Sequence, residues 1–224
     1  YPANLQNAAT PNASSTCTGA AITAAAAANT LAVTGASIPA NGSCTVKVDV
    51  TPTTTGSFVN TLAIGAVTST NAGANTAAAT ATLTAQSGPT ATKTFVPANI
   101  APNGTSVLTI AIANPNTSAV TGVAFTDSYP AGLVNTGTPA GAITGAGCSG
   151  TVTAAAGGAS LALSGATVPA SGSCTITVNV TASSPGSYVN STGAITTANG
   201  GSGSAASGTL RVFAAPTVVK TFAP

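Results

Sequence analysis

Charge is what this chain lacks most. Of its 224 residues, four are Lys or Arg, two are acidic and none is His. Charged residues therefore make up 3% of the chain, against roughly 25% in an ordinary soluble domain. The absence of His and Glu excludes Ser-His-Asp, Cys-His and paired-carboxylate catalysis within one domain. No Gly-rich phosphate loop follows a strand and opens a helix. We expect neither an enzyme nor a bound cofactor.

Three further absences narrow the class of protein. No run of about 18 large apolar residues occurs, so we expect no membrane span in this segment. The net charge of +2 comes without a basic cluster, so nucleic acid is not an expected partner. With no His and no CxxC pair, we expect no metal site. Disorder is disfavoured too, because net charge is low and Val, Ile, Leu and Phe recur throughout.

What the chain does contain is a long internal repeat. Residues 31–60 and residues 161–190 are identical at seventeen of thirty positions. The segment "YPANL" at residues 1–5 likewise returns as "YPAGL" at residues 129–133. The period of about 130 residues is the size of one β domain.

The repeats predict three segments. Residues 1–88 form the C-terminal part of one repeat and lack the strands that correspond to residues 89–128. Residues 89–215 form a complete repeat, and residues 216–224, "PTVVKTFAP", match the opening "PTATKTFVP" and form the first strand of another. We expect another chain, or further sequence of a longer tandem array, to complete the first domain. Self-association or adjacent repeats are thus the expected partners.

The strand pattern predicts the fold class. "TSVLTIAIANP" places Leu108, Ile110 and Ile112 on one face, and about seven short strands separated by Gly, Pro, Asn and Ser clusters make up the complete repeat. The Ala-rich run at residues 19–33 has Gly-Gly at the matching place in its counterpart, which favours a hairpin over a helix. We predict an all-β protein of tandem immunoglobulin-like antiparallel β-sandwich domains.

The order of these motifs resembles a known family. "KTFVPANIAPNGTSVLTIAIANPN", "VAFTDSYPAGL", "GATVPASGSCTITVNVT" and "GSYVN" follow one another as in the DUF11-like repeats of large bacterial surface proteins. The resemblance implies an extracellular, cell-surface stalk or filament module without enzymatic activity.

The four cysteines predict one disulfide in each repeat. Cys17 and Cys44 are 27 residues apart, Cys148 and Cys174 are 26 apart, and the two pairs occupy matching positions. Disulfides indicate an oxidising compartment. Zinc binding is the disfavoured alternative.

One lysine recurs two residues before a phenylalanine, in Lys93 and again in Lys220. Residues two apart in a strand share a face, so an inward Phe95 places Lys93 inward. Asp127 and Asn190 likewise lie two residues after an aromatic residue. Burial lowers the pKa of a lysine and raises that of an aspartic acid. Lys93, Asp127 and Asn190 are therefore candidates for a Lys–Asn isopeptide cross-link, with Asp127 assisting.

Ordinary roles for the same residues stay open. Lys93 could guard an exposed strand edge or make a non-covalent contact with Asp127, which could instead hold a turn. Asn190 could bond backbone at a strand end. Asn60 and Lys220 are the equivalents of Asn190 and Lys93 across repeats or subunits.

Two functional hypotheses follow. The first is a structural repeat of an extracellular microbial fibre, filament or adhesin stalk. The alternative is an adhesin or binding module in which Thr-rich strands such as residues 75–85 present a flat glycan- or ice-binding face. A regular Thr ladder across adjacent strands would favour the alternative. Six Asn-x-Ser/Thr sequons occur, about as many as chance gives, so a glycan partner stays open.

Overall fold

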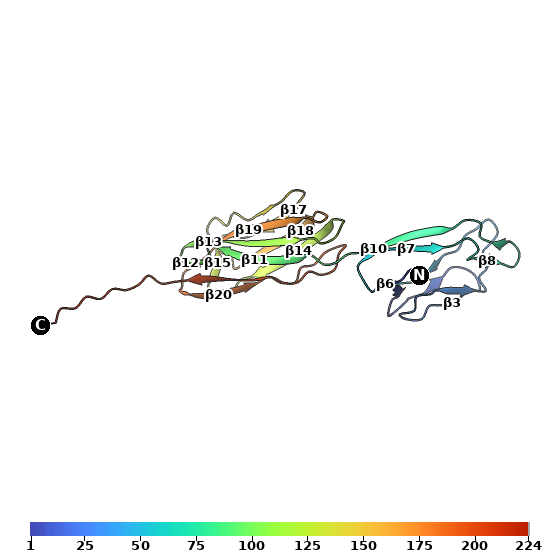
Figure 1. Ribbon diagram of the computed structural model, residues 1–224, viewed down its shortest axis with the longest axis horizontal. Coiled ribbons are helices and arrows are strands. Elements are labelled where there is room, and N and C mark those ends of the chain that lie inside the picture. Colours follow the sequence, from blue (N-terminus) through green and yellow to red (C-terminus); the bar gives the residue numbers. More distant parts are fainter. Residues whose placement is uncertain (224) are drawn as a thin grey trace. The chain divides into compact units, whose positions relative to one another are not determined.

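The computed structural model describes residues 1–223, and within them the regular structure is entirely β (Figure 1). No helix among these residues is long and apolar enough to cross a membrane. The chain divides into two compact units, Tyr1–Ala85 (unit 1) and Gln86–Pro224 (unit 2).

Unit 2 is a two-layered sandwich. The first layer has the order β11-β13-β19, with β15 and β16 both pairing with β19. The second layer consists of the sheets β17-β18-β14 and β12-β21-β20, and β14 contacts β20. The strands are β11 (Thr90–Val96), β12 (Asn99–Ile100), β13 (Thr105–Ala113), β14 (Val120–Ser128), β15 (Leu133–Asn135), β16 (Ala142–Thr144), β17 (Ser149–Thr153), β18 (Ser160–Val168), β19 (Ser173–Ala182), β20 (Gly186–Ser191) and β21 (Ser207–Val212).

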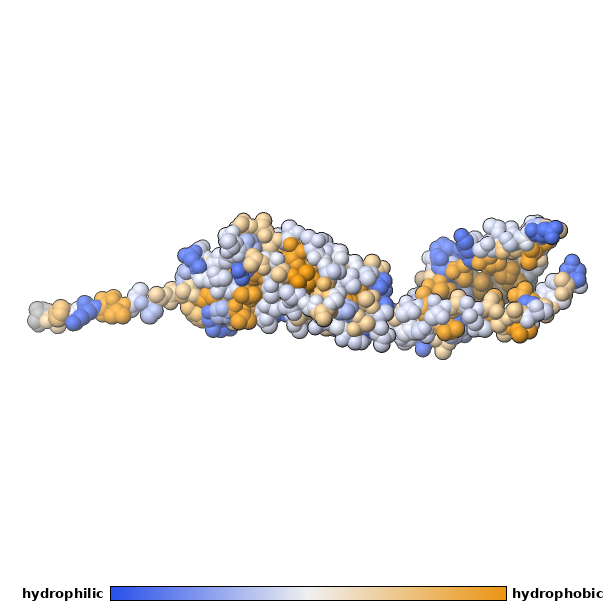
Figure 2. Space-filling model, turned by 90° about the horizontal axis from the view of Figure 1, so that it is seen from above, coloured by the Kyte–Doolittle hydropathy of each residue, from blue (hydrophilic) through white to orange (hydrophobic). Residues whose placement is uncertain are grey.

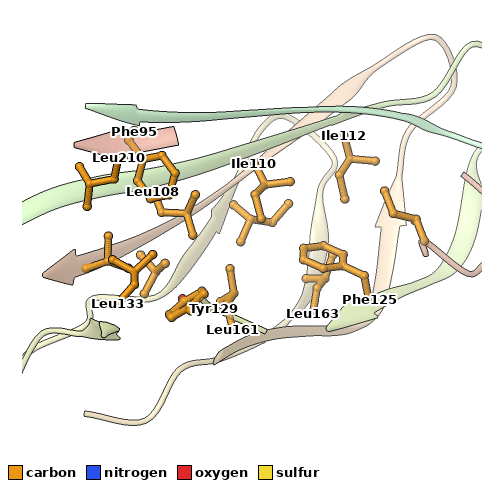
Figure 3. Packing of buried hydrophobic residues seen from close by; sticks show 14 of the residues in the cluster. Phe95, Leu108, Ile110, Ile112, Phe125, Tyr129, Leu133, Leu161, Leu163 and Leu210 are labelled. Carbon is orange, nitrogen blue, oxygen red and sulfur yellow. The ribbon is translucent and has the colours of Figure 1, made fainter. Parts of the chain in front are cut away.

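Alternating burial along the strands builds the core of unit 2. In β13 and β19 every second side chain is buried, as expected for a sheet with one face on a core. Figure 3 shows Ile110 and Ile112 of the first layer pointing toward Phe125, Leu161 and Leu163 of the second. Burial of such side chains stabilises a fold by about 1.5–3 kcal/mol each.

The predicted fold class is confirmed. The strands pair antiparallel apart from a short parallel pair between β12 and β21. The Ala-rich run also forms the predicted hairpin rather than a helix, with β3 (Ala21–Thr23) antiparallel to β4 (Ala32–Thr34). In unit 2 its counterpart joins β17 to β18 around Gly157 and Gly158.

Unit 1 has no comparable core. Its strands form only two-stranded sheets, which are β1-β6, β2-β5, β3-β4, β7-β10 and β8-β9. Leu5 and Phe58 are its buried hydrophobic residues. The remaining strands of unit 1 are β1 (Leu5–Asn7), β2 (Ser14–Ser15), β5 (Val46–Lys47), β6 (Val50–Pro52), β7 (Gly56–Leu62), β8 (Thr68–Ser69), β9 (Gly73–Ala74) and β10 (Ala79–Ala85).

Both predicted disulfides are present. Cys17 is bonded to Cys44 with a Cα–Cα distance of 4.9 Å, and Cys148 to Cys174 with 5.8 Å. The assignment of residues 216–224 to the first strand of a following repeat stays a prediction. Residues 216–223 form no strand and are exposed (Figure 1), because no neighbouring strand bonds them. Residue 224 lies outside the described residues.

Candidate functional site: a buried Lys–Asp–Asn cluster

Three strands from both layers bring Lys93, Asp127 and Asn190 together. Lys93 lies on β11 at the edge of the first layer, where β11 contacts β21. Asp127 and Asn190 lie on β14 and β20 of the second layer. Each is buried, as is the aromatic residue two positions before or after it. The two-residue spacing from an inward aromatic therefore does place each polar side chain in the core.

The cluster is joined by short hydrogen bonds. Lys93 Nζ donates to Oδ1 and Oδ2 of Asp127, at 2.7 Å each. Asn190 Nδ2 donates to Asp127 Oδ2 at 3.0 Å. Both side chains of the ion pair are 0% exposed. One carboxylate thus contacts both the amine and the amide.

Burial sets the electrostatics of the pair. Desolvation lowers the pKa of Lys93 below its ordinary value, and the hydrogen bond and charge of Asp127 oppose this only in part. Burial, with the nearby charge of Asp127, raises the pKa of Tyr129. Moving one proton from Nζ to the carboxylate turns an ion pair into a neutral amine and a neutral acid, with no change in the net charge buried. A site of low polarity favours that transfer over keeping two charges.

One buried polar atom of the cluster has no hydrogen-bond partner among the described residues. It is Asn190 Oδ1, although such atoms are nearly always bonded in native proteins. Exchanging the oxygen and nitrogen of the amide would place Oδ1 beside Asp127 Oδ2. That contact is favourable only when Asp127 carries a proton.

Gly208 lets β11 approach β21 at this point. A Cβ at position 208 would lie 3.0 Å from the carbonyl oxygen of Lys93, tighter than ordinary contacts, and Gly208 pairs with Asn190 across β20 and β21. No motif in the sequence marks this residue. In a chain with 25 glycines, one Gly in a strand is a weak signal of close backbone approach.

The ordinary roles that the sequence left open do not fit this geometry. Lys93 is 6% exposed, so it does not guard a strand edge. Asp127 lies within β14 rather than in the turn before Tyr129. Asn190 donates to a carboxylate rather than to backbone. The non-covalent Lys–Asp contact is the one alternative that matches.

The equivalent residues in the other repeats each have different surroundings from those of the cluster. Asn60 is half-buried, and Lys220 is exposed, its Nζ 5.1 Å from the centroid of the Phe222 ring. Lys47 and Asp49, which replace Thr177 and Asn179 of unit 2, are both exposed. Asp49 accepts a hydrogen bond from Asn12 rather than pairing with Lys47.

A second polar network, also missed from the sequence, recurs in both units. Tyr129 Oη donates to Asn135 Oδ1 at 2.9 Å, and Asn135 Nδ2 donates to two backbone carbonyls. Tyr1 and Asn7 make the same set of contacts in unit 1. The repeated "YPAxLxN" was the available signal. Because every polar atom of this Asn is satisfied, the network is structural rather than reactive.

The outer face of the first layer of unit 2 carries an ordered set of threonines. The pairing puts Thr94, Thr109 and Thr177 in one row across three strands. The next row is Thr92, Ala111, Thr175 and Thr144. By contrast, residues 75–85, the segment predicted to carry such a face, contribute Thr80, Thr82 and Thr84 to the two-stranded β7-β10 sheet only.

Comparison with known proteins identifies the family. The protein-family model "Domain of unknown function (DUF7933)" matches residues 1–85 and 89–212. The chain belongs to this family. The two matched ranges fall one in unit 1 and one in unit 2. The match is to the DUF7933 model, and the DUF11-like assignment stays a prediction.

No curated protein matches the DUF7933 chain, but solved structures do. It is similar to a cohesin module from the Clostridium perfringens ATCC13124 family 33 glycoside hydrolase, at 12% identity and TM-score 0.43, covering 58% of this chain and 100% of that one. It is also similar to the collagen-binding domain of a Staphylococcus aureus adhesin, at 13% identity and TM-score 0.37, covering 57% and 99%. A non-cellulosomal cohesin from the archaeon Archaeoglobus fulgidus matches at 14% identity and TM-score 0.37, covering 58% and 92%. At these values the likenesses carry no functional argument.

Proposed function

We propose that this DUF7933 chain is a structural module of an extracellular microbial stalk or filament, and that unit 2 cross-links itself through a Lys93–Asn190 isopeptide bond. The observation that carries the proposal is the buried carboxylate of Asp127, which contacts both partners at 2.7 and 3.0 Å. Two disulfides, which require an oxidising compartment, support the extracellular location.

The chemistry is an amide exchange that needs no other reactant. Transfer of a proton from Lys93 Nζ to Asp127 leaves a neutral amine and a neutral acid. The amine attacks Cγ of Asn190 while the acid donates its proton to the amide and polarises it. The Nζ–Cγ bond forms, the Cγ–Nδ2 bond breaks and ammonia leaves. Asp127 then accepts the second proton of the attacking amine, so the site ends with the isopeptide bond, free ammonia and a protonated, neutral Asp127.

Such a bond suits a module that carries tension. A pull on the two ends of unit 2 acts on β11, near its start, and on β21, near its end. Lys93 is on β11, and Asn190 is on β20, which pairs with β21 along its whole length. Force would pass directly between the terminal strands through a covalent bond. The sheets between them would not have to resist it with hydrogen bonds, which contribute only about 1 kcal/mol each.

Single-molecule stretching tests this proposal. With the bond in place, the chain between residues 93 and 190 cannot extend. With both disulfides reduced, unit 2 should then lengthen by about 3.3–3.6 Å less for each of those roughly 97 residues than the Asn190→Ala variant does. Asn60→Ala, the equivalent change in unit 1, serves as the matched control and should behave as the unchanged chain. Equal extension of unit 2 with and without Asn190 would contradict the mechanical role.

The threonine rows favour a second candidate function, binding of an uncharged ligand by the outer face of the first layer. None of the hydroxyls of Thr92, Thr94, Thr109 and Thr177 makes a hydrogen bond within the described residues. Strand geometry spaces them about 4.8 Å across and 6.7 Å along the sheet, as a flat glycan- or ice-binding face would require. Thr109→Lys should abolish retention on neutral insoluble glycan or on ice if this face binds, and Thr82→Lys on β10 is the control.

A further inference from the structure

The sandwich of unit 2 keeps most of its charge inside. Between residues 86 and 212, the charged residues are Lys93, Asp127 and Arg211. Lys93 and Asp127 are buried, and Arg211 is exposed. Figure 2 accordingly shows the visible face of unit 2 mostly in pale colours of intermediate hydropathy. Because buried charges are costly unless their partners are held in place, the contacts that align the strands of the cluster bear directly on its chemistry.

The acid and the amide of the cluster lie in different sheets. Asp127 is on β14, which pairs with β18, and Asn190 is on β20, which pairs with β21. The sheets β17-β18-β14 and β12-β21-β20 share no strand. Asn190 Nδ2 nevertheless lies 3.0 Å from Asp127 Oδ2. A contact outside both sheet ladders must therefore hold β14 and β20 together at this point.

That contact is made by the segment directly after β20, residues 192–196, which we call the joint. Gly193 N donates a hydrogen bond to the carbonyl oxygen of Thr126 on β14, at 2.9 Å. Farther along, Thr196 and Ala124 exchange two backbone hydrogen bonds, at 2.9 and 3.0 Å. The joint thus bonds the chain that carries β20 to β14.

The first bond of the joint requires glycine. A Cβ at position 193 would lie 2.8 Å from the carbonyl oxygen of Thr126, closer than real Cβ atoms approach such an atom. A glycine within or beside a strand commonly marks a place where another backbone comes this near. A larger residue would push β14 away, and Asp127, the next residue after Thr126, would move with it. Gly193 therefore sets the separation between the acid and the amide.

Thr192 fixes the joint on its other side. Its side chain is buried, its backbone N donates to Ala206 O, and its Oγ1 accepts from Ala206 N, both at 2.9 Å. The hydroxyl oxygen takes the place of a backbone carbonyl in this second bond. Pairing with the β21 side of the sheet therefore continues past Asn190 up to the residue at which the chain turns to β14.

We propose that Thr192 and Gly193 are positioning residues of the Lys93–Asn190 cross-link, an inference that rests on the proposed function of unit 2. Thr192 holds the chain after Asn190 against the β21 side, and Gly193 holds it against β14. Together they keep Cγ of Asn190 within reach of both the amine and the acid. Neither supplies a reacting group. Their effect is on the rate, since a misplacement of about 1 Å can slow a reaction about a hundred-fold.

The rate of ammonia loss tests the proposal. The full chain is made by cell-free synthesis, folded chains are selected by their resistance to protease, and their mass is followed with time. Gly193→Ala should slow cross-linking about ten-fold or more. Thr192→Val, which keeps the shape of the side chain but removes the hydroxyl, should slow it several-fold. Thr192→Ser, which keeps the hydroxyl, should react at the rate of the unchanged chain.

Thr197→Val is the matched control. Thr197 Oγ1 accepts a hydrogen bond from Gly200 N at 3.0 Å, so this change removes the same kind of contact just outside the joint. It should leave the rate of cross-linking unchanged. If Gly193→Ala yields no folded chain, the comparison of Thr192→Val with Thr192→Ser and Thr197→Val still decides the matter.

Three results would overturn the proposal. Equal rates in Thr192→Val and the unchanged chain would show that the joint does not limit a reaction that does occur, and the proposed function would stand. Equal slowing by Thr192→Val and Thr197→Val would show a general loss of stability instead of positioning. An unchanged chain that never loses ammonia would contradict the proposed cross-link and this proposal together.

Discussion

Lys93 donates both of its hydrogen bonds to Asp127, from the opposite layer of the sandwich, with Nζ 2.7 Å from each carboxylate oxygen. Breaking a buried ion pair by removing one partner costs about 3–5 kcal/mol. Replacing both partners with apolar residues of similar size, by contrast, often leaves stability unchanged or improves it. Stability alone is therefore a weak reason for a buried ion pair. We propose that the adjacent amide of Asn190 gives the pair a chemical role instead.

The proposed catalytic role of Asp127 predicts the effect of Asp127→Asn. This change keeps the size of the side chain but removes the group that accepts and returns the proton. The variant should fold, because the amide oxygen can still accept from Lys93, and it should retain its full uncross-linked mass. Asp49→Asn, at the other acidic residue, is the control and should lose ammonia like the unchanged chain. Full cross-linking in Asp127→Asn would show that the acid is not needed.

Gly208→Ala tests whether close approach of β11 limits the reaction. The new Cβ would stand 3.0 Å from the Lys93 carbonyl oxygen, so β11 must shift away from Asn190. The cross-linked fraction, read by mass, should fall several-fold at early times after synthesis. Gly186→Ala is the control, because its Cβ would meet Tyr188 at an ordinary 3.7 Å. If both variants cross-link at the same rate, the approach of the backbone is not limiting.

The disulfide of unit 2 should contribute independently of the cross-link. Closing a loop of 26 residues stabilises by about 3–4 kcal/mol in the chain-entropy model. The double variant Cys148→Ser and Cys174→Ser should lower the free energy of unfolding of unit 2 by about that amount in denaturant titration. Its mass should still show the loss of ammonia. A variant that no longer cross-links would mean that the disulfide positions the reacting strands.

An uncross-linked unit 2 should gain stability with rising pH. In Asn190→Ala, Lys93 stays a titrating amine whose pKa burial lowers from its ordinary 10.5. Between the lowered pKa and 10.5 the unfolded chain holds more protons than the folded one, so the free energy of unfolding increases with pH. The cross-linked protein has an amide there and lacks this slope. The free energy of unfolding is measured by urea titration at pH values below the ordinary Tyr pKa of 10.0, so that Tyr129 does not contribute. An equal slope of this free energy against pH in the two proteins would contradict the prediction.

The sequence predicted the parts of the fold and cluster that depend on strand parity. Lys93 lies two residues before Phe95, and a strand puts both on one face, so its burial followed from local pattern. Pairing of the cysteines followed from the repeat. That Lys93, Asp127 and Asn190 would meet was a hypothesis rather than a consequence of parity, because their contacts depend on how β14 and β20 meet across 63 residues of chain.

Other features could not be predicted from the spacing of residues within one strand. The close approach at Gly208 and the unpartnered Oδ1 of Asn190 are properties of three strands together, and no spacing encodes them. The threonine face was expected on residues 75–85 but is broader on β11, β13 and β19, since only pairing register aligns Thr94, Thr109 and Thr177 in a row.

The intact mass of the purified chain tests the central claim most directly. With both disulfides reduced, condensation of Lys93 with Asn190 predicts a mass lower by one ammonia, about 17 Da, than the sequence gives. Peptide mapping should then join the fragments that carry Lys93 and Asn190, and Lys93→Met should restore the full mass. A wild-type mass equal to that of the sequence, with Lys93 and Asn190 in separate peptides, would show that the cluster is a salt bridge and that unit 2 is not covalently closed.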